Sequence, residues 1–294
     1  MDSFVVARYL STGNVKNFLC RPEIPINQSY EHLVEAFNLP VWSGNSCFLN
    51  TMFAVFFAAP KNRVFFLSQL QQSCTEIIVP SCRIETIKVL RQLVQEYVKG
   101  KTTVHNFRKS FQSTSGNTCT ISVGKPGDRG DTANIFSKFY NLIICSKDDP
   151  PMIVFIVGLF VHFNTQMTLF NRNCPIVGFE YQDNTYEIPT MFSKYVNNDL
   201  QIQFEIKNEK NLTYTFNSLT YGSEHHVVVV VQKEPQQFVL YDDFKHMPTD
   251  KAHVLVQDVV YLKGTDSTFF TLILPPEYVD DYHPLFLTYT LKVL

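Results

Sequence analysis

The segment EHHVVVVVQKEPQQFVLYDD, residues 224–243, has the pattern of a buried β-hairpin. Its five consecutive valines, Val227–Val231, are β-branched and apolar on both faces, as is typical of a strand in the middle of a sheet. A second apolar strand over 237–241 follows a short polar turn. In an antiparallel pair, the start of the first strand lies beside the end of the second. The hairpin therefore brings the two histidines that open it close to the two aspartates that end it.

Short apolar runs separated by turn residues continue on both sides of this hairpin, from Pro151 onward. They predict further strands over 152–163, 176–181, 201–206, 212–220, 254–262 and 268–274. Before Pro151 the apolar residues recur at helical spacing instead. They predict a helix over 47–59 that stops at Pro60, a helix over 84–99 with Gly100 after it, and a helix from Asp131 or Thr132 to Ile143, with a loop over 113–130. We expect an α+β fold class, with a helical lobe (1–150) packed on a β-rich lobe (151–294) in one domain, 1–294.

The composition limits the classes of function. Of the 294 residues, 45% are hydrophobic and the net charge is −2, so global disorder is excluded and no nucleic-acid partner is expected. The longest apolar run, Met152–Phe163, is shorter than the roughly 20 residues of a membrane helix, so no membrane contact is expected. The first residues lack a signal-peptide pattern, and the seven cysteines include no CxxC pair. We expect an intracellular protein, cytoplasmic or nuclear, with reduced thiols and no metal.

A second segment, SGNSCFLN at residues 43–50, carries a candidate nucleophile. A glycine-containing turn delivers Cys47 to the start of an apolar helix. The partial positive charge at a helix N-terminus favours a thiolate, and the free backbone N–H groups there can receive an oxyanion. The alternative interpretation is a buried structural cysteine near a helix start.

Together the two segments place a cysteine, a histidine and an aspartate in the order of the nucleophile, base and orienting carboxylate of a papain-like thiol hydrolase. The residues also resemble the ubiquitin-specific proteases. Ser43–Thr51 is similar to the cysteine box of that family, and 225–243 is similar to its histidine box. Two weaker landmarks, Asp131–Ile135 and Tyr186–Tyr195, fall between them in the family's order.

The resemblance implies a papain-like cysteine protease fold, with a helical thumb lobe and an antiparallel β-sheet palm lobe. It implies hydrolysis of the peptide or isopeptide bond after the C-terminal Gly of ubiquitin or a ubiquitin-like protein, with no cofactor. Cys47 would be the nucleophile and Asp242 the orienting carboxylate, favoured over Asp243 because it directly follows an aromatic residue. His226 is favoured as the base, with His225 as the competing candidate, and only one can face the cysteine. The implied oxyanion hole is Asn45 with the Cys47 backbone, and the implied substrate contacts are His225, Tyr241 and Trp42.

At three points the sequence departs from the family pattern, and these departures leave alternative functions open. Trp42 stands where the family has an oxyanion-hole Asn, Ala54 replaces a Gln, and the four zinc-binding cysteines of the fingers are absent. We therefore expect reduced or absent fingers and slow turnover. The alternatives are a weak or inactive relative that binds ubiquitin, and a papain-like hydrolase of an unrelated substrate. A second match to the cysteine box ends at Cys119, but the β-branched residues that follow start no helix, so Cys47 is favoured.

Overall fold

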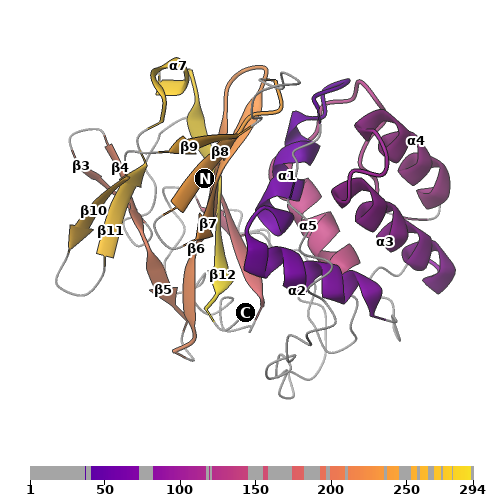
Figure 1. The fold of residues 1–294 in the computed structure, drawn as a ribbon, viewed down its shortest axis with the longest axis horizontal. Helices are drawn as coiled ribbons and strands as arrows, with labels where there is room; N and C mark the ends of the chain where they lie inside the picture. The colour runs from indigo at the N-terminus through magenta and orange to yellow at the C-terminus, as the bar shows by residue number, and fades with distance from the viewer. Residues whose placement is uncertain are drawn as a thin grey trace, which may run out of the picture.

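The computed structural model describes most of the central and C-terminal chain (Figure 1). The described residues are 37, 41–72, 82–116, 119, 121–144, 155–157, 174–181, 193–196, 199–208, 211–234, 237–244, 253–256, 259–263, 268–272, 274–279 and 281–292. Among them, no helix is long and apolar enough to span a membrane. The sequence segment Tyr186–Tyr195 lies outside this set except for its last three residues.

The helices occupy the first half of the described chain. They are α1 (Cys47–Phe57), α2 (Pro60–Gln71), α3 (Ile84–Val98), α4 (Val104–Ser115), α5 (Thr132–Ile143) and, much later, the short α7 (Pro276–Val279). The prediction of a helix that begins after Asp131 is confirmed, because the Asp131 side chain accepts a hydrogen bond from the Asn134 N–H as an N-cap. Gly100, just past α3, has the left-handed φ of +68° that terminates many helices.

The strands follow, and all but a few lie in one sheet. They are β1 (Phe155–Val157), β2 (Ile176–Tyr181), β3 (Ser193–Val196), β4 (Asp199–Gln203), β5 (Glu205–Lys207), β6 (Thr213–Gly222), β7 (Val227–Glu234), β8 (Gln237–Tyr241), β9 (His253–Val256), β10 (Val259–Lys263), β11 (Thr268–Leu272) and β12 (His283–Leu291). The described strands of the main sheet run in the order β1-β2-β12-β6-β7-β8-β9, with β5 also paired to β6. The remaining strands form a second sheet, β10-β11-β4-β3. The α+β expectation is confirmed at this level, since helices precede a mostly antiparallel sheet in which, among the described strands, only β1 and β2 pair in parallel.

The predicted hairpin is confirmed. β7 pairs antiparallel with β8, with Val229 opposite Tyr241, and β7 also pairs with β6 on its other side. Val228–Val231 are completely buried, as expected for a central strand.

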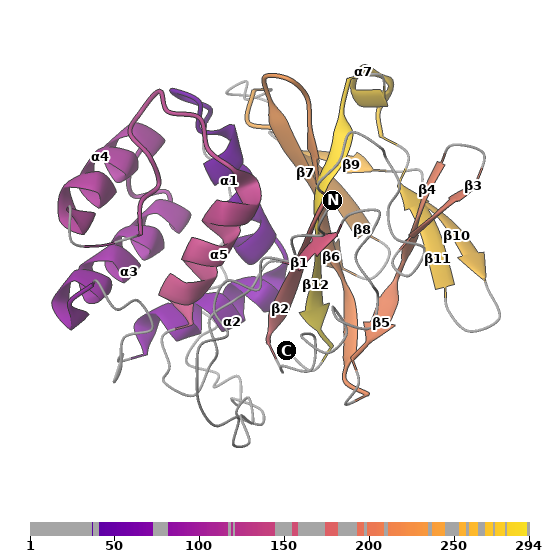
Figure 2. The same cartoon turned by 180° about the vertical axis from the view of Figure 1, so that it is seen from behind.

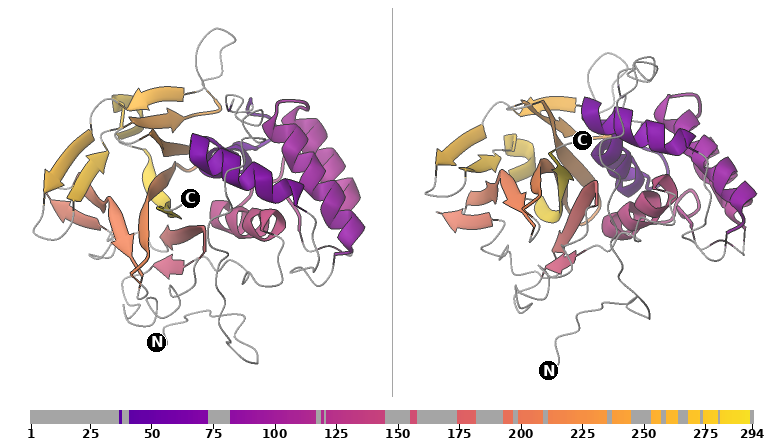
Figure 3. Two further views of the ribbon diagram at one scale, coloured as in Figure 1. Left: turned by 60° about the horizontal axis from the view of Figure 1, so that its bottom comes forward. Right: turned by 90° about the horizontal axis from the view of Figure 1, so that it is seen from below.

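The helices α1 to α5 pack on one side of the main sheet, and α7 lies apart from them (Figures 1 and 2). α1 and α5 lie between the sheet and the outer helices α3 and α4, and Figure 3 shows the same layering from two other directions. Every residue of α1 is buried, and this helix packs against β7. Contacts between phenylalanine rings continue the core from α1 into α5 and on to β12, stacked between Phe56 and Phe136 and edge-on between Phe136 and Phe286. The first residue of α1 is thus fixed beside the start of the central strand.

Several elements differ from the sequence prediction. The first helix ends at Phe57, two residues earlier than predicted, and Pro60 begins α2, because proline is well tolerated in the first helical turn. The strand predicted over 254–262 is divided between β9 in the main sheet and β10 in the second sheet, and β3 was not predicted. α4 covers residues that the pattern left unassigned and extends into the predicted loop. β12 was not predicted, although it lies between β2 and β6 in the main sheet.

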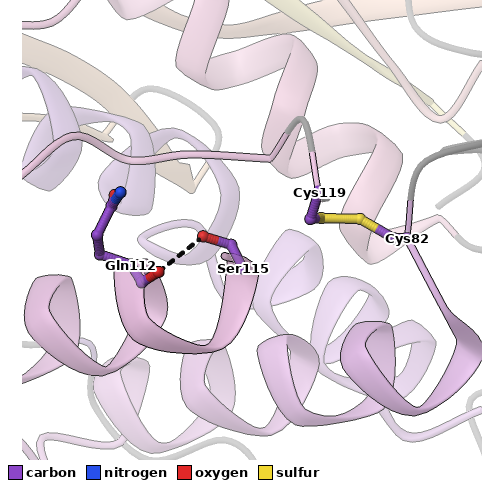
Figure 4. The surroundings of a disulfide bond; sticks show 4 residues. All are labelled: Cys82, Gln112, Ser115 and Cys119. Carbon is purple, nitrogen blue, oxygen red and sulfur yellow. Dashed lines mark hydrogen bonds between the residues drawn. A yellow bond between two sulfur atoms is a disulfide. The ribbon is translucent and has the colours of Figure 1, made fainter. Parts of the chain in front are cut away.

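The expectation that the cysteines are reduced thiols is wrong for one pair. Cys82, at the entry to α3, forms a disulfide with Cys119, which follows α4 (Figure 4). Both residues are buried, and the two positions are 37 residues apart in sequence. No sequence motif marked this pair, since their proximity arises only when α3 and α4 pack together. Cys119 is therefore not a free thiol in this structure, whereas Cys47 is.

Candidate active site

Cys47 is the first residue of α1 and follows a tight turn. Gly44 and Asn45 both have left-handed backbone angles, with φ of +53° and +58°. The Ser46 side chain accepts a hydrogen bond from the Ser43 N–H, and the Ser46 carbonyl accepts from the N–H groups of Leu49 and Asn50. The first two N–H groups of the helix, at Cys47 and Phe48, have no helical acceptor. Backbone N–H groups at a helix start can bind a negatively charged oxygen.

His226 stands directly before β7 and points inward. The turn before it is closed by Ser223, whose N–H donates to the His226 carbonyl at 2.8 Å. His226 is only 4% exposed, whereas the side chain of His225 is 68% exposed and lies 3.6 Å from the Glu224 carboxylate. Adjacent residues point to opposite sides of an extended chain, so the structure brings His226 to the site and leaves His225 in solvent.

Asp242 holds the imidazole of His226. His226 Nε2 donates a 2.8 Å hydrogen bond to Asp242 Oδ1, which also accepts from the Phe244 N–H at 2.9 Å. The other carboxylate oxygen accepts from the Tyr278 hydroxyl at 2.6 Å. Burial opposes the charged form of Asp242, but these hydrogen bonds hold its pKa below the usual range. Asp242 is therefore an ionised group in a buried site.

The other ring nitrogen of His226, Nδ1, is the one that Asp242 does not hold. Nδ1 is buried and makes no hydrogen bond of ordinary geometry within the described residues. Burial lowers the pKa of His226, but the hydrogen bond to Asp242, the neighbouring Cys47 side chain and the charges of Asp243 and Asp242 together raise it to about 9. Because Asp242 occupies Nε2, Nδ1 is the ring nitrogen that remains for proton exchange.

Asp243 forms a second buried carboxylate beside the first. Its Oδ1 lies 3.6 Å from His226 Nε2, and its Oδ2 accepts a 2.6 Å hydrogen bond from the Asn50 side chain. Asn50 in turn donates to Ser46 Oγ and accepts from the Tyr97 hydroxyl at 2.6 Å. Burial raises the pKa of Asp243 to about 7 against the hydrogen bond from Asn50. This network ties α1 to the end of β8.

An aromatic side chain covers the histidine. The ring of Phe244 lies 4.0 Å from that of His226 and 4.8 Å from that of Trp42, measured between ring centroids. Phe244 is 52% exposed although it is apolar, whereas Cys47 is only 8% exposed. Trp42 is anchored by its backbone N–H, which donates to the Asp243 carbonyl. Trp42 therefore lies next to the site, against Phe244.

Two residues named from the sequence are occupied elsewhere. The Asn45 side chain donates a 2.7 Å hydrogen bond to the Gly127 carbonyl, across the loop that faces the turn. Tyr241, the last residue of β8, is 1% exposed and packs edge-on against Phe37, because its side chain points away from that of Asp242, which follows it. In this structure Tyr241 has no surface to offer a substrate.

The three side chains His226, Asp242 and Asp243 also satisfy a simple criterion for metal ligands, since their ligand atoms lie within 4.8 Å of one another. However, the 2.8 Å hydrogen bond between His226 and Asp242 leaves no space for an ion between those two atoms. The donor set fits a hydrogen-bonded acid–base pair better than a metal site.

Sequence reasoning missed several residues that complete the site. Asn50 lies in the quoted cysteine segment, and its spacing of one helical turn from Ser46 is a signal that could have identified it. Tyr97 and Tyr278 come from α3 and α7, far away in sequence, and nothing in the sequence connects them to the hairpin. A fourth such residue, Arg108, is described further below.

Comparisons with known proteins give no family. No protein-family model matches the chain, and no curated protein matches it. Among solved structures, it is similar to a SAGA Ubp8/Sgf11/Sus1/Sgf73 DUB module bound to ubiquitin aldehyde, at TM-score 0.42 and 6% identity over 89% of this chain and 71% of the other. It is similarly related to an essential yeast splicing factor, at TM-score 0.42 and 9% identity over 87% and 69%. Superposition at these scores is too loose to assign the chain a family or an activity.

Proposed function

We propose that the chain is a cysteine protease in which Cys47 is the nucleophile, His226 the base and Asp242 the orienting carboxylate. The observation that supports this most strongly is the position of His226. Its buried imidazole is held by Asp242 through Nε2, and the Cys47 side chain is one of the neighbours that raise its pKa. The order and spacing of these groups match the roles that thiol hydrolysis requires. The helical half and the β-rich half would then be two lobes of one catalytic domain.

The proposed reaction has two stages. The Cys47 proton moves to His226, and the thiolate attacks the carbonyl carbon of the scissile bond. The backbone N–H groups of Cys47 and Phe48 stabilise the oxyanion, and the imidazolium returns a proton to the leaving amine as the C–N bond breaks. Water, deprotonated by His226, then hydrolyses the thioester and restores the thiol.

The proposed substrate is a conjugate of ubiquitin or a ubiquitin-like protein, cleaved after its C-terminal Gly. This follows from the likeness of the segments around Cys47 and His226 to the two boxes of the ubiquitin-specific proteases. Such a substrate would place the protein in the cytoplasm or the nucleus.

A second candidate function is binding of the same partner without turnover. It is favoured by Trp42 in the place of the family's oxyanion Asn and by the Asn45 amide, which is engaged by the Gly127 carbonyl. Loss of one oxyanion donor typically costs about 10²–10³ in rate. This candidate predicts tight binding of ubiquitin with no reaction at Cys47.

A ubiquitin probe with an electrophilic C-terminus tests both candidates. We expect intact mass spectrometry to show one adduct on the wild type, none on Cys47→Ala, and a much slower adduct on His226→Ala. His225→Ala is the matched control, since it removes the neighbouring histidine in solvent, and we expect it to label like the wild type. A folded wild type that binds ubiquitin but never labels would leave only the second candidate. A wild type whose Cys47 alkylates but ignores ubiquitin would point to an unrelated substrate.

A further inference from the structure

Arg108 is a buried cation that the proposed catalytic groups do not use. It projects from α4 and is completely buried, the largest such side chain among the described residues. Burying a guanidinium costs free energy unless its donors are satisfied. Here burial lowers the pKa of Arg108 from its ordinary value, and the nearby Asp128 carboxylate opposes that change. Arg108 therefore needs hydrogen-bond acceptors for its buried donors.

The guanidinium joins two separate segments of backbone. Nη1 donates to the Gly44 carbonyl at 2.7 Å, in the turn before Cys47. Nη2 donates to the carbonyls of Lys125 and Asp128, and Nε to that of Gly124, all in the loop that faces the turn. The planar fork of an arginine can reach both segments at once, which a single ammonium group cannot.

The turn and the loop are also bonded directly to each other. The Gly127 N–H donates to the Gly44 carbonyl at 2.8 Å, and the Asn45 amide donates to the Gly127 carbonyl at 2.7 Å. A β-carbon at Gly44 would lie 3.0 Å from the Gly127 nitrogen, so a larger residue at position 44 would crowd the facing loop. The left-handed Asn45 that follows is unfavourable by itself and needs such contacts to hold it.

The same cation lies close to the nucleophile. Arg108 stands over the Phe48 ring at 5.5 Å, and its charge interacts with Cys47. Arg108 thus contacts the residues on both sides of Cys47, through the Gly44 carbonyl before it and the Phe48 ring after it.

We propose that Arg108 is a positioning residue that holds the left-handed turn before Cys47. This rests on the proposed role of Cys47 as nucleophile. Arg108 acts through the Gly44 carbonyl, to which it donates.

Arg91 provides a matched control. It is also a buried arginine of the helical half, and it also donates to backbone carbonyls, those of Leu70 and Gln69 at the end of α2. Arg91→Met therefore removes a comparable buried fork that does not contact the Cys47 turn.

The test measures the rate of iodoacetamide alkylation of Cys47 from pH 4 to 10, site-resolved by mass spectrometry. For Arg108→Met we expect labelling by the ubiquitin probe to be at least about tenfold slower, because the turn before Cys47 is no longer held. For Arg108→Lys, which retains the charge without the fork, we expect the same loss of probe labelling. Arg91→Met should reproduce the wild type in both measurements once rates are normalised to the folded fraction.

The outcomes separate this inference from the proposed function. A wild-type Cys47 that alkylates no faster at pH 6 than a free thiol would overturn the proposed nucleophile before any variant is compared. A reactive wild type with Arg108 variants indistinguishable from Arg91→Met would overturn the role of Arg108 alone. If Arg108→Met does not fold, Arg108→Lys decides, because unchanged probe labelling in that variant would contradict the proposal.

Discussion

The hydroxyl of Tyr278 donates a 2.6 Å hydrogen bond to Asp242 Oδ2, the carboxylate oxygen that His226 does not occupy. Tyr278 comes from the short α7, 36 residues beyond Asp242. Its ring is buried, and its hydrogen bond is one of the interactions that lower the pKa of Asp242. The carboxylate is thus held from both sides by residues of different elements.

Tyr278→Phe should weaken the site as well as the fold. Removing a buried donor from a charged acceptor costs about 1–3 kcal/mol in the free energy of unfolding. We expect that loss in urea denaturation, together with slower labelling of Cys47 by the ubiquitin probe. Tyr289→Phe is the matched control, because its hydroxyl donates to the Gln203 carbonyl in the core. It should lose stability while labelling at the wild-type rate, and equal labelling by both variants would show that Tyr278 is only structural.

The Asn50 amide is expected to be a major contributor to stability at the junction of α1 and the hairpin. Asn50→Ala leaves the Asp243 carboxylate and the Tyr97 hydroxyl without a partner that each uses at 2.6 Å. We predict a loss of about 2 kcal/mol or more in the free energy of unfolding, measured in urea. Gln92→Ala removes an exposed amide whose hydrogen bond to Glu96 spans one helical turn. It should change stability by less than about 0.5 kcal/mol, and a similar effect of both variants would contradict this role of Asn50.

Stability should fall as the pH rises above neutral because of His226. Its folded-state pKa of about 9 exceeds the unfolded value near 6.5, so its contribution is complete below about pH 6.5 and is lost as the pH rises through 9. Urea denaturation from pH 5 to 10 should show this decline in the wild type and in His225→Ala. His226→Ala should have a flatter profile between pH 6.5 and 9. An unchanged slope in that variant would assign the decline to other groups.

Asp243 should act in the same direction at lower pH. Burial raises its pKa to about 7, whereas an unfolded aspartate loses its proton near pH 4. The folded chain therefore binds more protons in that interval, and stability decreases as the pH rises through it. Asp243→Asn should remove this part of the slope in the same denaturation series. If the stability of Asp243→Asn still falls between pH 4 and 7 as it does in the wild type, Asp243 is not the group responsible. Its carboxyl is then ionised in the folded chain over that interval.

Reduction of the Cys82–Cys119 disulfide should destabilise the helical half. A link between positions 37 residues apart restricts the unfolded chain by about 3–4 kcal/mol in the loop-entropy model. We expect the double variant Cys82→Ser with Cys119→Ser to unfold at lower urea concentration than the wild type without reductant. Adding reductant should bring the wild type to the level of the variant and leave the variant unchanged. Equal midpoints for both proteins without reductant would show that the link contributes no stability.

The parts of the structure that the sequence predicted are those set by local pattern. The valine run and its partner strand, the amphipathic α3 and the Asp131 cap each depend on residues within about 20 positions. The contact between His226 and Asp242 belongs to the same group, since the hairpin alone brings them together, whereas the link to Cys47, far away in sequence, came only from the resemblance. The choice between His225 and His226 came from the structure. Side chains alternate along a strand, so a shift of one residue exchanges the histidine that faces inward.

What the sequence could not predict depends on contacts between distant segments. α2 buries polar residues such as Asn62 and Arg63 along with apolar ones, so it has no clear apolar face to recognise. Asn62 donates to the side chains of Asn217 and Thr290, partners more than 150 residues away. β12 and the partners of Arg108 are likewise set by tertiary packing, which no single segment encodes.

The place of β12 has a consequence for how the protein is made. Within the described strands, β12 is the only link between β1-β2 and β6-β7-β8-β9, and it is the last of them to be synthesised. While the chain is still emerging from the ribosome, the hairpin with His226 and Asp242 can pair locally, but the sheet stays split until residues 283–291 appear. Tyr278 also emerges only a few residues earlier. A nascent chain would therefore carry the side chains of Cys47, His226 and Asp242 while its main sheet is still divided, and the described sheet would be complete only once residues 283–291 have been synthesised.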